Sequence, residues 1–376
     1  MALPYTEEHD MFRRSVRAFV EREIAPHHER WEDEGIVDRD LWRKAGGAGL
    51  LLTGIASEYG GGGGDFLMTL IMTEELTRGV FSGPGFRLHS DIVAPYIEHL
   101  GTEEQKRRWL PAMASGEMVA AVAMTEPGAG SDLQAIRTTA IRDGDDYVVN
   151  GQKTFISNGS MADLVVVAVK TDPAEGARGT SLLVIEAERA GFAKGKRLKK
   201  LGLKAQDTAE LYFDDVRVPV ANRLGEEGKG FAYLMRELPR ERLIAAAIGV
   251  IAAEAALDWT IDHVKSRKAF GGTLFDLQNT RFVLGELKTE VEIGRTFLDD
   301  CTLLLMRGGL DATRAAMAKL WCTELEGRVI DRCLQLFGGY GYMWEYPIAR
   351  AYADARVHRI LAGSNEIMKE LVARSL

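Results

Sequence analysis

The sequence has little cysteine, with only Cys301, Cys322 and Cys333 in a chain of 376 residues. They are too few and too widely spaced for a disulfide framework or a CxxC metal site. The adjacent histidines, His27 and His28, cannot both face one metal ion from a helix. We therefore expect buried, reduced thiols in a cytoplasmic protein, and no metal site.

Two further absences concern membranes. The N-terminus has no basic region followed by an apolar run, which argues against a secretory signal. The longest uncharged apolar stretch, Leu243–Ala253, is well short of the roughly 18 residues that span a bilayer. We therefore expect no membrane span.

An excess of positive charge is also missing. Lys and Arg number 47 against 55 Asp and Glu, which gives a formal net charge of −8. A protein whose main partner is nucleic acid usually carries the opposite balance, so we expect no nucleic-acid partner. The negative total does not exclude an anionic ligand, because ligand binding depends on the local field.

The composition that is present, 46% hydrophobic and 27% charged, is typical of a soluble globular protein. The length suggests two or three domains. The hydrophobic period changes from helical to alternating near residue 120 and returns to helical near residue 229. We therefore predict an α+β protein with a helical domain at 1–120, a β domain at 121–228 and a helical bundle at 229–376.

Individual elements follow from the same periodicity. Helices are expected after an N-cap at Thr6 and at Asp40–Ala48, Phe66–Thr77, Ile92–His99, Thr102–Ala114, Arg242–Arg267, Thr280–Arg307, Asp311–Phe337 and Ser364–Ala373. Strands are expected at Tyr147–Val149, Lys153–Ser157, Leu164–Lys170, Ser181–Ile185 and Glu210–Val218. The first two strands are predicted to form a hairpin around a tight Asn150-Gly151 turn. No helical pattern separates the strands, which argues against a Rossmann-type domain.

Several other segments favour loops or fail the spacing of a known motif. Gly60–Gly64 is a run of five glycines and most simply forms a flexible loop. Lys194–Lys200 is basic and is more typical of a solvated loop than of a phosphate contact. Gly225–Gly230 resembles a P-loop but has glycine where Ser or Thr must bind magnesium. The sequence contains no GxSxG nucleophile motif.

A run of small residues gives the strongest functional signal. Ala123–Ala135 reads AMTEPGAGSDLQA, a turn with exposed backbone N–H groups and with hydroxyls at Thr125 and Ser131. Such a turn can approach a flat heterocycle or a phosphate closely. Taken alone, a Gly/Ser turn is more often only a turn, so the whole run has to be considered.

Five segments together resemble the acyl-CoA dehydrogenase family, whose members are FAD enzymes. In chain order they are AMTEPGAGSDLQA at 123–135, FISNG at 155–159, RKAFG at 267–271, QLFGGYGY at 335–342 and GSNEI at 363–367. The resemblance covers essentially the whole chain. It implies an N-terminal helical domain, a middle β-barrel domain and a C-terminal four-helix bundle, assembled as a homotetramer.

The resemblance assigns the FAD site residue by residue. The turn around Thr125 would line the flavin, and Ser157 would address flavin N5 from the opposite side. Arg267 and Gln278 would hold the pyrophosphate and adenosine parts, and Gln335–Gly339 would do the same from a neighbouring subunit. The full expected set is Met124, Thr125, Gly130, Ser131, Phe155, Ser157, Arg267, Phe270, Gln278, Gln335, Gly338, Gly339, Ser364 and Glu366.

These residues also have simpler interpretations. Without the resemblance, Arg267 would suggest a surface salt bridge. Gly338 and Gly339 would suggest an ordinary helix stop.

The position of the catalytic base departs from the majority pattern of the family. Removing an α-proton from an acyl thioester requires a desolvated carboxylate beside the substrate. Most members carry it as the Glu of a YEGT-like tail segment, but Ala362 stands there in this chain, and a methyl group cannot accept a proton. A minority branch places the base at the start of the first helix of the C-terminal domain.

The segment ELPRERL at 237–243 resembles the long-chain acyl-CoA dehydrogenases of that branch. Glu241 would be the base, and Arg242 would contact the CoA part. From the residues alone, Glu241 could instead be a first-turn glutamate favoured by the helix dipole. The missing tail glutamate favours the catalytic interpretation.

The expected substrate contacts are Ser131, Arg242, Ala362 and Gly363. The backbone N–H of Ala362, with a ribityl hydroxyl of FAD, would bond the thioester carbonyl and stabilise developing enolate charge, for which no side chain is required.

The resemblance implies α,β-dehydrogenation of a fatty acyl-CoA to trans-2-enoyl-CoA, with hydride transfer to flavin N5 and an electron-transfer flavoprotein as electron acceptor. One alternative is an oxygen-using relative, such as an acyl-CoA oxidase or a hydroxylase-like enzyme. Another is a non-catalytic member of the family, as Ala362 suggests. The sequence fixes neither the length nor the branching of the acyl chain.

Overall fold

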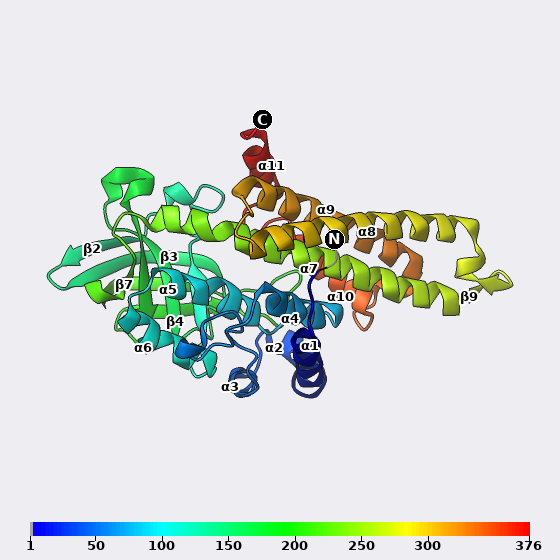
Figure 1. The fold of residues 1–376 in the computed structure, drawn as a ribbon, viewed down its shortest axis with the longest axis horizontal. Helices are drawn as coiled ribbons and strands as arrows, with labels where there is room; N and C mark the ends of the chain where they lie inside the picture. The colour runs from blue at the N-terminus through cyan, green and yellow to red at the C-terminus, as the bar shows by residue number, and fades with distance from the viewer. Residues whose placement is uncertain (1–2) are drawn as a thin grey trace.

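The computed structural model describes residues 3–376. Along the chain, a group of helices is followed by a group of strands and then by a second group of helices (Figure 1). The predicted order of elements is confirmed. The N-terminal helices are α1 (Glu7–Phe19), α2 (His28–Glu34), α3 (Arg39–Gly47), α4 (Phe66–Arg78), α5 (Ala94–Leu100) and α6 (Glu103–Ala114). The π-helical turns η1 (Val20–Ile24) and η3 (Leu88–Val93) continue α1 and precede α5. Thr6 is the N-cap of α1 as predicted, whereas α2 was not predicted.

Helix α4 separates two apolar cores. Nearly all of its residues are buried, and the side chain of Asp65 caps its first turn by accepting from Leu67 N. Ile71 packs into the core beneath the N-terminal helices, and Leu70 packs into the core of the C-terminal bundle. A helix that is buried on nearly all sides is expected in such an interior position.

The middle domain is one eight-stranded sheet with the path β6-β7-β3-β2-β4-β5-β8, and β1 pairs with β4. The strands are β1 (Ala120–Ala123), β2 (Thr139–Asp143), β3 (Asp146–Ser157), β4 (Leu164–Lys170), β5 (Thr180–Glu186), β6 (Phe192–Arg197), β7 (Thr208–Pro219) and β8 (Arg223–Leu224). The neighbouring strands β4 and β5 are buried along their whole length.

The predicted Asn150-Gly151 hairpin is wrong. β3 continues through both residues, and the register of its pairing with β7 shifts between Val149 and Gly151. A Cβ on Gly151 would lie 2.5 Å from Thr138 Oγ1, so the glycine permits a close approach inside a bulged strand. The hairpin turn lies instead at Gly144, which has φ of 64° and joins β2 to β3.

Two predicted loops are also corrected. Part of the basic run expected to be a solvated loop, Lys194–Arg197, forms β6 and pairs with β7. The glycine run is tightly packed, because a Cβ on Gly61 would lie 2.2 Å from Ile55 O. The N–H of Gly64 donates to Thr53 O at 2.8 Å, so only glycine fits this ordered loop.

The C-terminal domain consists of α7 (Gly230–Ser266), α8 (Gln278–Met306), α9 (Ala312–Phe337), α10 (Pro347–His358) and α11 (Asn365–Ala373). α7 packs on α8 and α9, and α10 and α11 pack on α9. The sequence pattern did not predict α10, and it placed the start of α7 at Arg242. Proline usually ends a helix, but α7 begins twelve residues earlier and continues through Pro239.

Helix α7 runs from the β domain almost to the opposite end of the molecule (Figure 1). Among residues 3–376 it is the one helix long and apolar enough to cross a membrane, but 72% of its most apolar window is buried inside the protein. This burial is typical of a core helix. The three cysteines are free and buried, as predicted.

Candidate active site

Glu241 lies in the N-terminal half of α7, with its side chain buried between two domains. Its Oε1 accepts a hydrogen bond of 2.9 Å from the hydroxyl of Tyr96 on α5. Tyr96 is fully buried and was not among the predicted site residues. A single sequence does not indicate which distant side chain meets the base.

The surroundings of Glu241 suit a general base at neutral pH. Burial raises the pKa of Glu241 to about 7, the Tyr96 hydrogen bond lowers it, Glu237 raises it and Arg242 lowers it. A base whose pKa lies close to the working pH combines sufficient ionisation with useful proton affinity. The predicted role of Glu241 therefore has a physical basis in its position.

Glu237, one helical turn before Glu241, has the opposite character. It accepts from His99 Nδ1 at 3.1 Å and from Arg236 Nε at 3.1 Å. Burial alone would raise the pKa of Glu237, but the His99 and Arg236 interactions outweigh it and hold this pKa below its ordinary value. One face of α7 therefore presents a carboxylate that stays ionised beside one that titrates near neutral pH.

The tail turn at Ala362-Gly363 contacts Arg242, the residue that follows Glu241. Arg242 Nε donates to Ala362 O at 3.4 Å, and the guanidinium is almost completely buried. Ala362 and Gly363 have positive φ values of 54° and 92°, so two consecutive residues adopt the left-handed conformation. A small residue and a glycine suit this turn, in which a Cβ on Gly363 would lie 2.8 Å from Met368 Cε.

A buried lysine that the sequence analysis missed holds the same turn. Lys319 on α9 is fully buried, and its Nζ donates to Gly363 O and to Asn365 Oδ1, both at 2.8 Å. Burial lowers the pKa of Lys319 to about 8. A lysine inside the apolar stripe of a predicted helix is a signal that could have identified it. Of the predicted tail residues, Ser364 caps α11 and Glu366 is exposed in the first turn of that helix.

The turn predicted to line a flavin follows β1 and is fastened to β3. Thr154 N donates to Thr125 O at 3.0 Å, and Lys153 Nζ donates to Met124 O at 3.0 Å. Lys153 also pairs with Glu126 at 2.8 Å, and both side chains are buried. The sequence reasoning missed this ion pair, which fixes the turn relative to the strand that carries Phe155 and Ser157.

Phe155 and the adjoining turn fit a flat heterocycle. Phe155 has φ of 60°, a strained value for a non-glycine residue, and the residue is 68% exposed. A Cβ on Gly130 would meet nothing within 4 Å, so the backbone there is open to a close approach. An exposed aromatic ring beside open backbone N–H groups suits a flavin ring.

The segment η3–α5 connects this turn to Glu241. His89 Nδ1 accepts from Ala120 N at 3.0 Å, at the start of the strand that leads into the turn. Seven residues further along, Tyr96 reaches Glu241. The predicted base and the predicted flavin turn are therefore attached to one short helical segment.

A second group of predicted residues lies together at the other end of α7. Its members are Arg267, Phe270, Gln278, Gln335, Gly338 and Gly339. The Arg267 guanidinium lies 5.2 Å from the centre of the Tyr340 ring, which joins the ends of α7 and α9. Gly338 ends α9 with φ of 59° and ψ of −138°, a conformation restricted to glycine.

This far-end group also fits a phosphate-bearing ligand. A Cβ on Gly338 or Gly339 would meet nothing within 4 Å, so both backbone segments are open. Among the described residues, Arg267 forms no salt bridge, and its guanidinium lies over the Tyr340 ring, where its charge would suit an anion. The simpler interpretation of Arg267 as a salt bridge is therefore wrong, whereas Gly338 is indeed a helix stop.

The two groups are far apart within one chain. Glu241 and Arg267 are separated by about 39 Å along α7 at roughly 1.5 Å per residue, and Figure 1 shows the two ends of the helix at opposite sides of the molecule. One chain therefore does not bring all of the predicted cofactor residues to a single place.

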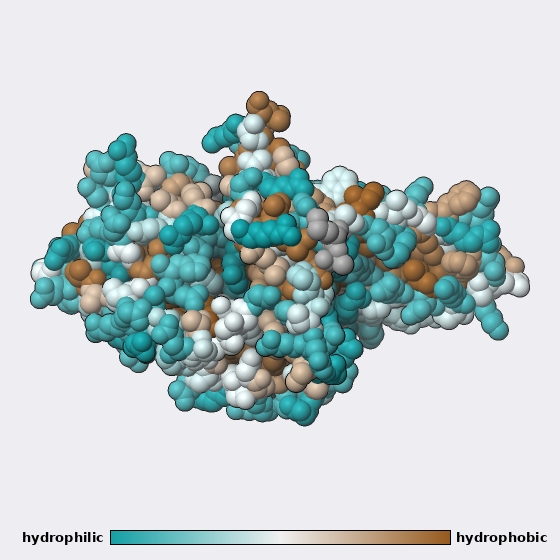
Figure 2. All heavy atoms as spheres, viewed as in Figure 1, coloured by the Kyte–Doolittle hydropathy of each residue, from teal (hydrophilic) through white to brown (hydrophobic). Residues whose placement is uncertain are grey.

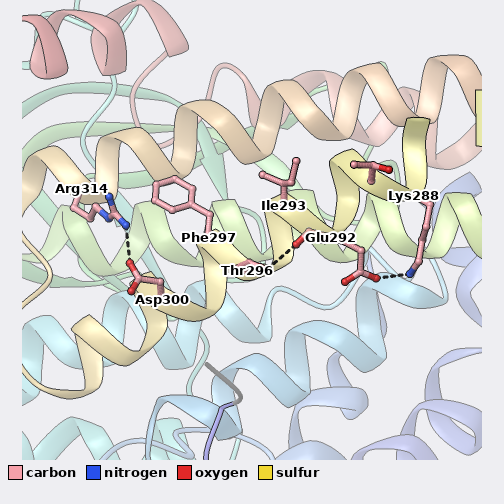
Figure 3. A pocket seen from close by; sticks show the side chains of 8 residues that line it. Lys288, Glu292, Ile293, Thr296, Phe297, Asp300 and Arg314 are labelled. Carbon is pink, nitrogen blue, oxygen red and sulfur yellow. Dashed lines mark hydrogen bonds and ion pairs between the residues drawn. The ribbon is translucent and has the colours of Figure 1, made fainter. Parts of the chain in front are cut away.

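A surface groove lies away from both groups. It has a volume of about 870 Å³ and runs along α8 beside the start of α9, where Arg314 pairs with Asp300 at 2.6 Å (Figure 3). Ile293 and Phe297 give it an apolar floor, and it contains none of the predicted site residues. Over residues 3–376, no cluster of His, Cys, Asp and Glu could hold a metal ion.

Comparison with protein families gives three matches in chain order. The N-terminal domain of acyl-CoA dehydrogenases matches residues 6–117, the middle domain matches 121–216 and the C-terminal domain matches 228–376. Together they cover almost the whole chain.

Individual relatives agree with this result. The mitochondrial long-chain specific acyl-CoA dehydrogenase of Rattus norvegicus is 52% identical over 99% of this chain and 87% of its own length. The crystal structure of an acyl-CoA dehydrogenase from Geobacillus kaustophilus has a TM-score of 0.98 at 51% identity, covering 100% of this chain and 99% of that one. A chain solved in a study of the electron transferring flavoprotein of Acidaminococcus fermentans has a TM-score of 0.92 at 36% identity, covering 100% and 99%.

Proposed function

The chain belongs to the acyl-CoA dehydrogenase family, and from that premise we propose that Glu241 is its catalytic base and a long-chain fatty acyl-CoA its substrate. It is an enzyme of fatty acid oxidation and uses FAD. The observation that carries the proposal is the buried carboxyl of Glu241, with a pKa of about 7, in a chain whose tail has Ala362 where most members have glutamate.

Glu241 performs the proton transfer. The α C–H bond of the acyl thioester breaks, the proton passes to the Glu241 carboxylate, and the electron pair left on the α-carbon becomes part of the new double bond. Bound FAD supplies the acceptor for the β-hydrogen and its two electrons. Because the carboxylate is desolvated, it is a stronger base than an exposed glutamate.

The tail turn stabilises the developing negative charge on the thioester oxygen. The proposed donor is the backbone N–H of Ala362, whose orientation is set by the left-handed turn. Arg242 and Lys319 hold the two carbonyls of this turn from α7 and α9. The predicted contacts of Arg242 with the CoA part, and of Ser131 and Gly363 with the substrate, stay predictions.

The cofactor would be held by two copies of the chain. The turn at Met124–Ser131, with Phe155 and Ser157, would hold the flavin end. The far-end group around Arg267 and Gly338 would hold the pyrophosphate and adenosine end of the FAD bound to a second copy, because these residues are too distant from the flavin turn of their own chain.

Exposed apolar residues support an assembly through the helical arm, which consists of the C-terminal part of α7, of α8 and of the segment between them. Figure 2 shows apolar side chains on the surface of the arm that carries the far-end group. Large exposed apolar residues on it are Phe270, Leu277, Phe282 and Ile293. Such surface usually marks an interface, which supports the predicted homotetramer.

The acyl chain length and the electron acceptor are proposed from the relatives. The rat enzyme with 52% identity is specific for long chains, which supports a long-chain substrate. The structural likeness to a chain from work on an electron transferring flavoprotein supports such a flavoprotein as acceptor. The predicted cytoplasmic location also stays a proposal, supported by three free, buried thiols.

The test is anaerobic mixing of the FAD-loaded protein with acyl-CoA substrates from short to long chains. We expect loss of the oxidised flavin absorbance, fastest with long chains. Glu241→Gln should retain FAD but lose bleaching by about 10³-fold, since a glutamine amide cannot take the proton. Glu290→Gln, at a half-buried glutamate on α8 that pairs with Arg328, is the control away from Glu241 and should behave as wild type.

Three outcomes would contradict parts of the proposal. Wild-type bleaching by Glu241→Gln would remove Glu241 as the base. Fastest bleaching with short chains would remove the long-chain substrate. In air, stoichiometric hydrogen peroxide and no reduction of an added electron-transfer flavoprotein would identify oxygen as the acceptor instead.

A further inference from the structure

Two pairs of side chains face each other across the contact between α5 and α7. Tyr96 and His99 are three residues apart on α5, and Glu237 and Glu241 are four residues apart on α7, so each pair lies on one helical face. Tyr96 donates to Glu241 at 2.9 Å, and His99 Nδ1 lies 3.1 Å from Glu237 Oε1. The base of the C-terminal domain is therefore held by a side chain of the N-terminal domain.

We propose that Tyr96 is a positioning residue for the catalytic base, whose hydroxyl holds one carboxylate oxygen of Glu241 and leaves the other free to take the proton. Glu237 is fixed by His99 and Arg236 and places a negative charge beside the base. This charge disfavours the ionised form of Glu241, whereas the Tyr96 hydrogen bond favours it. This inference rests on the proposed role of Glu241.

The geometry supports this division of the two oxygens. Oε1 of Glu241 accepts the Tyr96 hydrogen bond, and within residues 3–376 the tyrosine hydroxyl has no other hydrogen-bond partner. A carboxylate oxygen that already accepts a strong hydrogen bond is the weaker proton acceptor of the two. The free oxygen, Oε2, is therefore the one that meets the substrate.

Tyr96 remains a donor at every working pH. Its side chain is fully buried, and burial followed by the charge of Glu241 raises the pKa of Tyr96 well above its ordinary value. The hydroxyl thus keeps its proton while Glu241 titrates. The hydrogen bond stabilises the ionised base and fixes its rotamer in both protonation states of the enzyme cycle.

The groups that face Glu241 act in different directions. From α5, Tyr96 favours the ionised carboxylate. From α7, Glu237 disfavours it and Arg242 favours it. Removing the tyrosine hydroxyl and removing the Glu237 charge should therefore move the titration of the base in opposite directions, which a general loss of folding cannot produce.

The experiment measures the pH dependence of kcat/KM, whose acid limb reports the base in the free enzyme. Tyr96→Phe should shift this limb upward by about one pH unit or more. Glu237→Gln should shift it downward by about half a unit or more. Tyr147→Phe removes another fully buried hydroxyl, which accepts from Arg223 on the β domain, and should leave the limb in place.

A second readout isolates the base from the redox step. An acyl-CoA analogue without β-hydrogens, such as 3,3-dimethylbutyryl-CoA, can lose an α-proton but cannot be oxidised. In D₂O, mass spectrometry would follow deuterium entry at its α-carbon. We expect the pH midpoint of this exchange to shift in the same directions for Tyr96→Phe and Glu237→Gln.

The outcomes separate this inference from the assignment of the base. An unchanged midpoint in Tyr96→Phe, or a rate lowered equally at every pH, would overturn the positioning role. If the pH midpoint moved in the same direction in both variants, Glu237 and Tyr96 would not have opposite effects on the base. Wild-type exchange by Glu241→Gln would instead show that the base itself was wrongly assigned.

Discussion

Glu241 combines two properties that oppose each other, because the burial that strengthens it as a base also makes its ionised form costly. Its pKa is about 7 in the folded chain against an ordinary value of 4.5. Between these values the folded protein binds more protons than the unfolded protein. The free energy of unfolding therefore falls as pH rises through this window, and the loss is complete above about pH 7.

Glu241→Gln should consequently be more stable than wild type at high pH. Glutamine keeps an oxygen that can accept from Tyr96 and does not titrate. We expect the difference in unfolding free energy between the two proteins to grow from pH 4.5 to pH 8, to at most about 3 kcal/mol. Chemical denaturation of the FAD-loaded proteins at pH 5 and pH 8 measures it. A difference independent of pH would contradict a buried, ionised Glu241.

For single residues, the sequence predicts those that lie within one recognisable motif. It does not predict residues that are distant in the chain and become neighbours only in the folded protein. Glu241 could be assigned because it lies in a recognisable segment and Ala362 has no proton acceptor. Tyr96 and Lys319 are 145 and 78 positions away from Glu241, and no local pattern relates them to it. Lys153 was missed because a lysine in a strand ordinarily faces solvent, whereas this one is buried against Glu126.

Helix α9 is hydrogen-bonded to the tail segment that precedes α11. Lys319 bonds the backbone carbonyl of Gly363 in this tail and the side chain of Asn365 at the start of α11, and Asn365 in turn bonds Thr323 on α9. These bonds fix the left-handed turn that orients the N–H of Ala362. A helix of the bundle thus holds the turn whose backbone N–H is the proposed donor to the substrate.

Lys319→Met should therefore lower kcat while FAD remains bound. Methionine fills a similar volume but leaves Gly363 O without its donor and removes one of the two donors to Asn365 Oδ1, so the turn loses its fixed orientation. We expect kcat to fall on the order of 10- to 100-fold, with a smaller change in KM. Steady-state kinetics measure both, and Lys288→Met on the exposed face of α8 is the control. An unchanged kcat would contradict a positioning role.

The differences between predicted and observed elements have local causes. A period of 3.6 identified the helices of the bundle, but Pro239 concealed the first turns of α7. An Asn-Gly pair usually marks a turn, yet at Asn150-Gly151 the close approach of Thr138 requires a glycine within a strand. The glycine run at Gly60–Gly64 is ordered by hydrogen bonds to a neighbouring segment, which composition cannot reveal.

In the whole molecule, α7 is the element that joins the two groups of proposed cofactor residues. It carries Glu241 near the β domain and Arg267 at the opposite end, about 39 Å away. The net charge of −8 is unfavourable for FAD and acyl-CoA, both polyanions. Their charge must be met locally, and the proposed groups for this are Arg267 and backbone N–H groups of the open glycine segments.

If each site is completed by a second copy, defects at the two ends of α7 should complement each other. Glu241→Gln removes the base, and Arg267→Glu places a negative charge at the far end. Each variant alone should be nearly inactive. In a mixed pair, the intact Glu241 of one chain and the intact Arg267 of the other share one site, so one of the two sites works.

Equal co-expression with random pairing makes half of the pairs mixed, so activity should recover to about one quarter of wild type. Activity per mole of chain, measured after purification of the mixture, gives this fraction. Mixing the separately purified variants without exchange of chains is the control and should give no recovery. Absence of recovery in co-expressed protein that contains both variants in one assembly would show that Arg267 serves the site of its own chain.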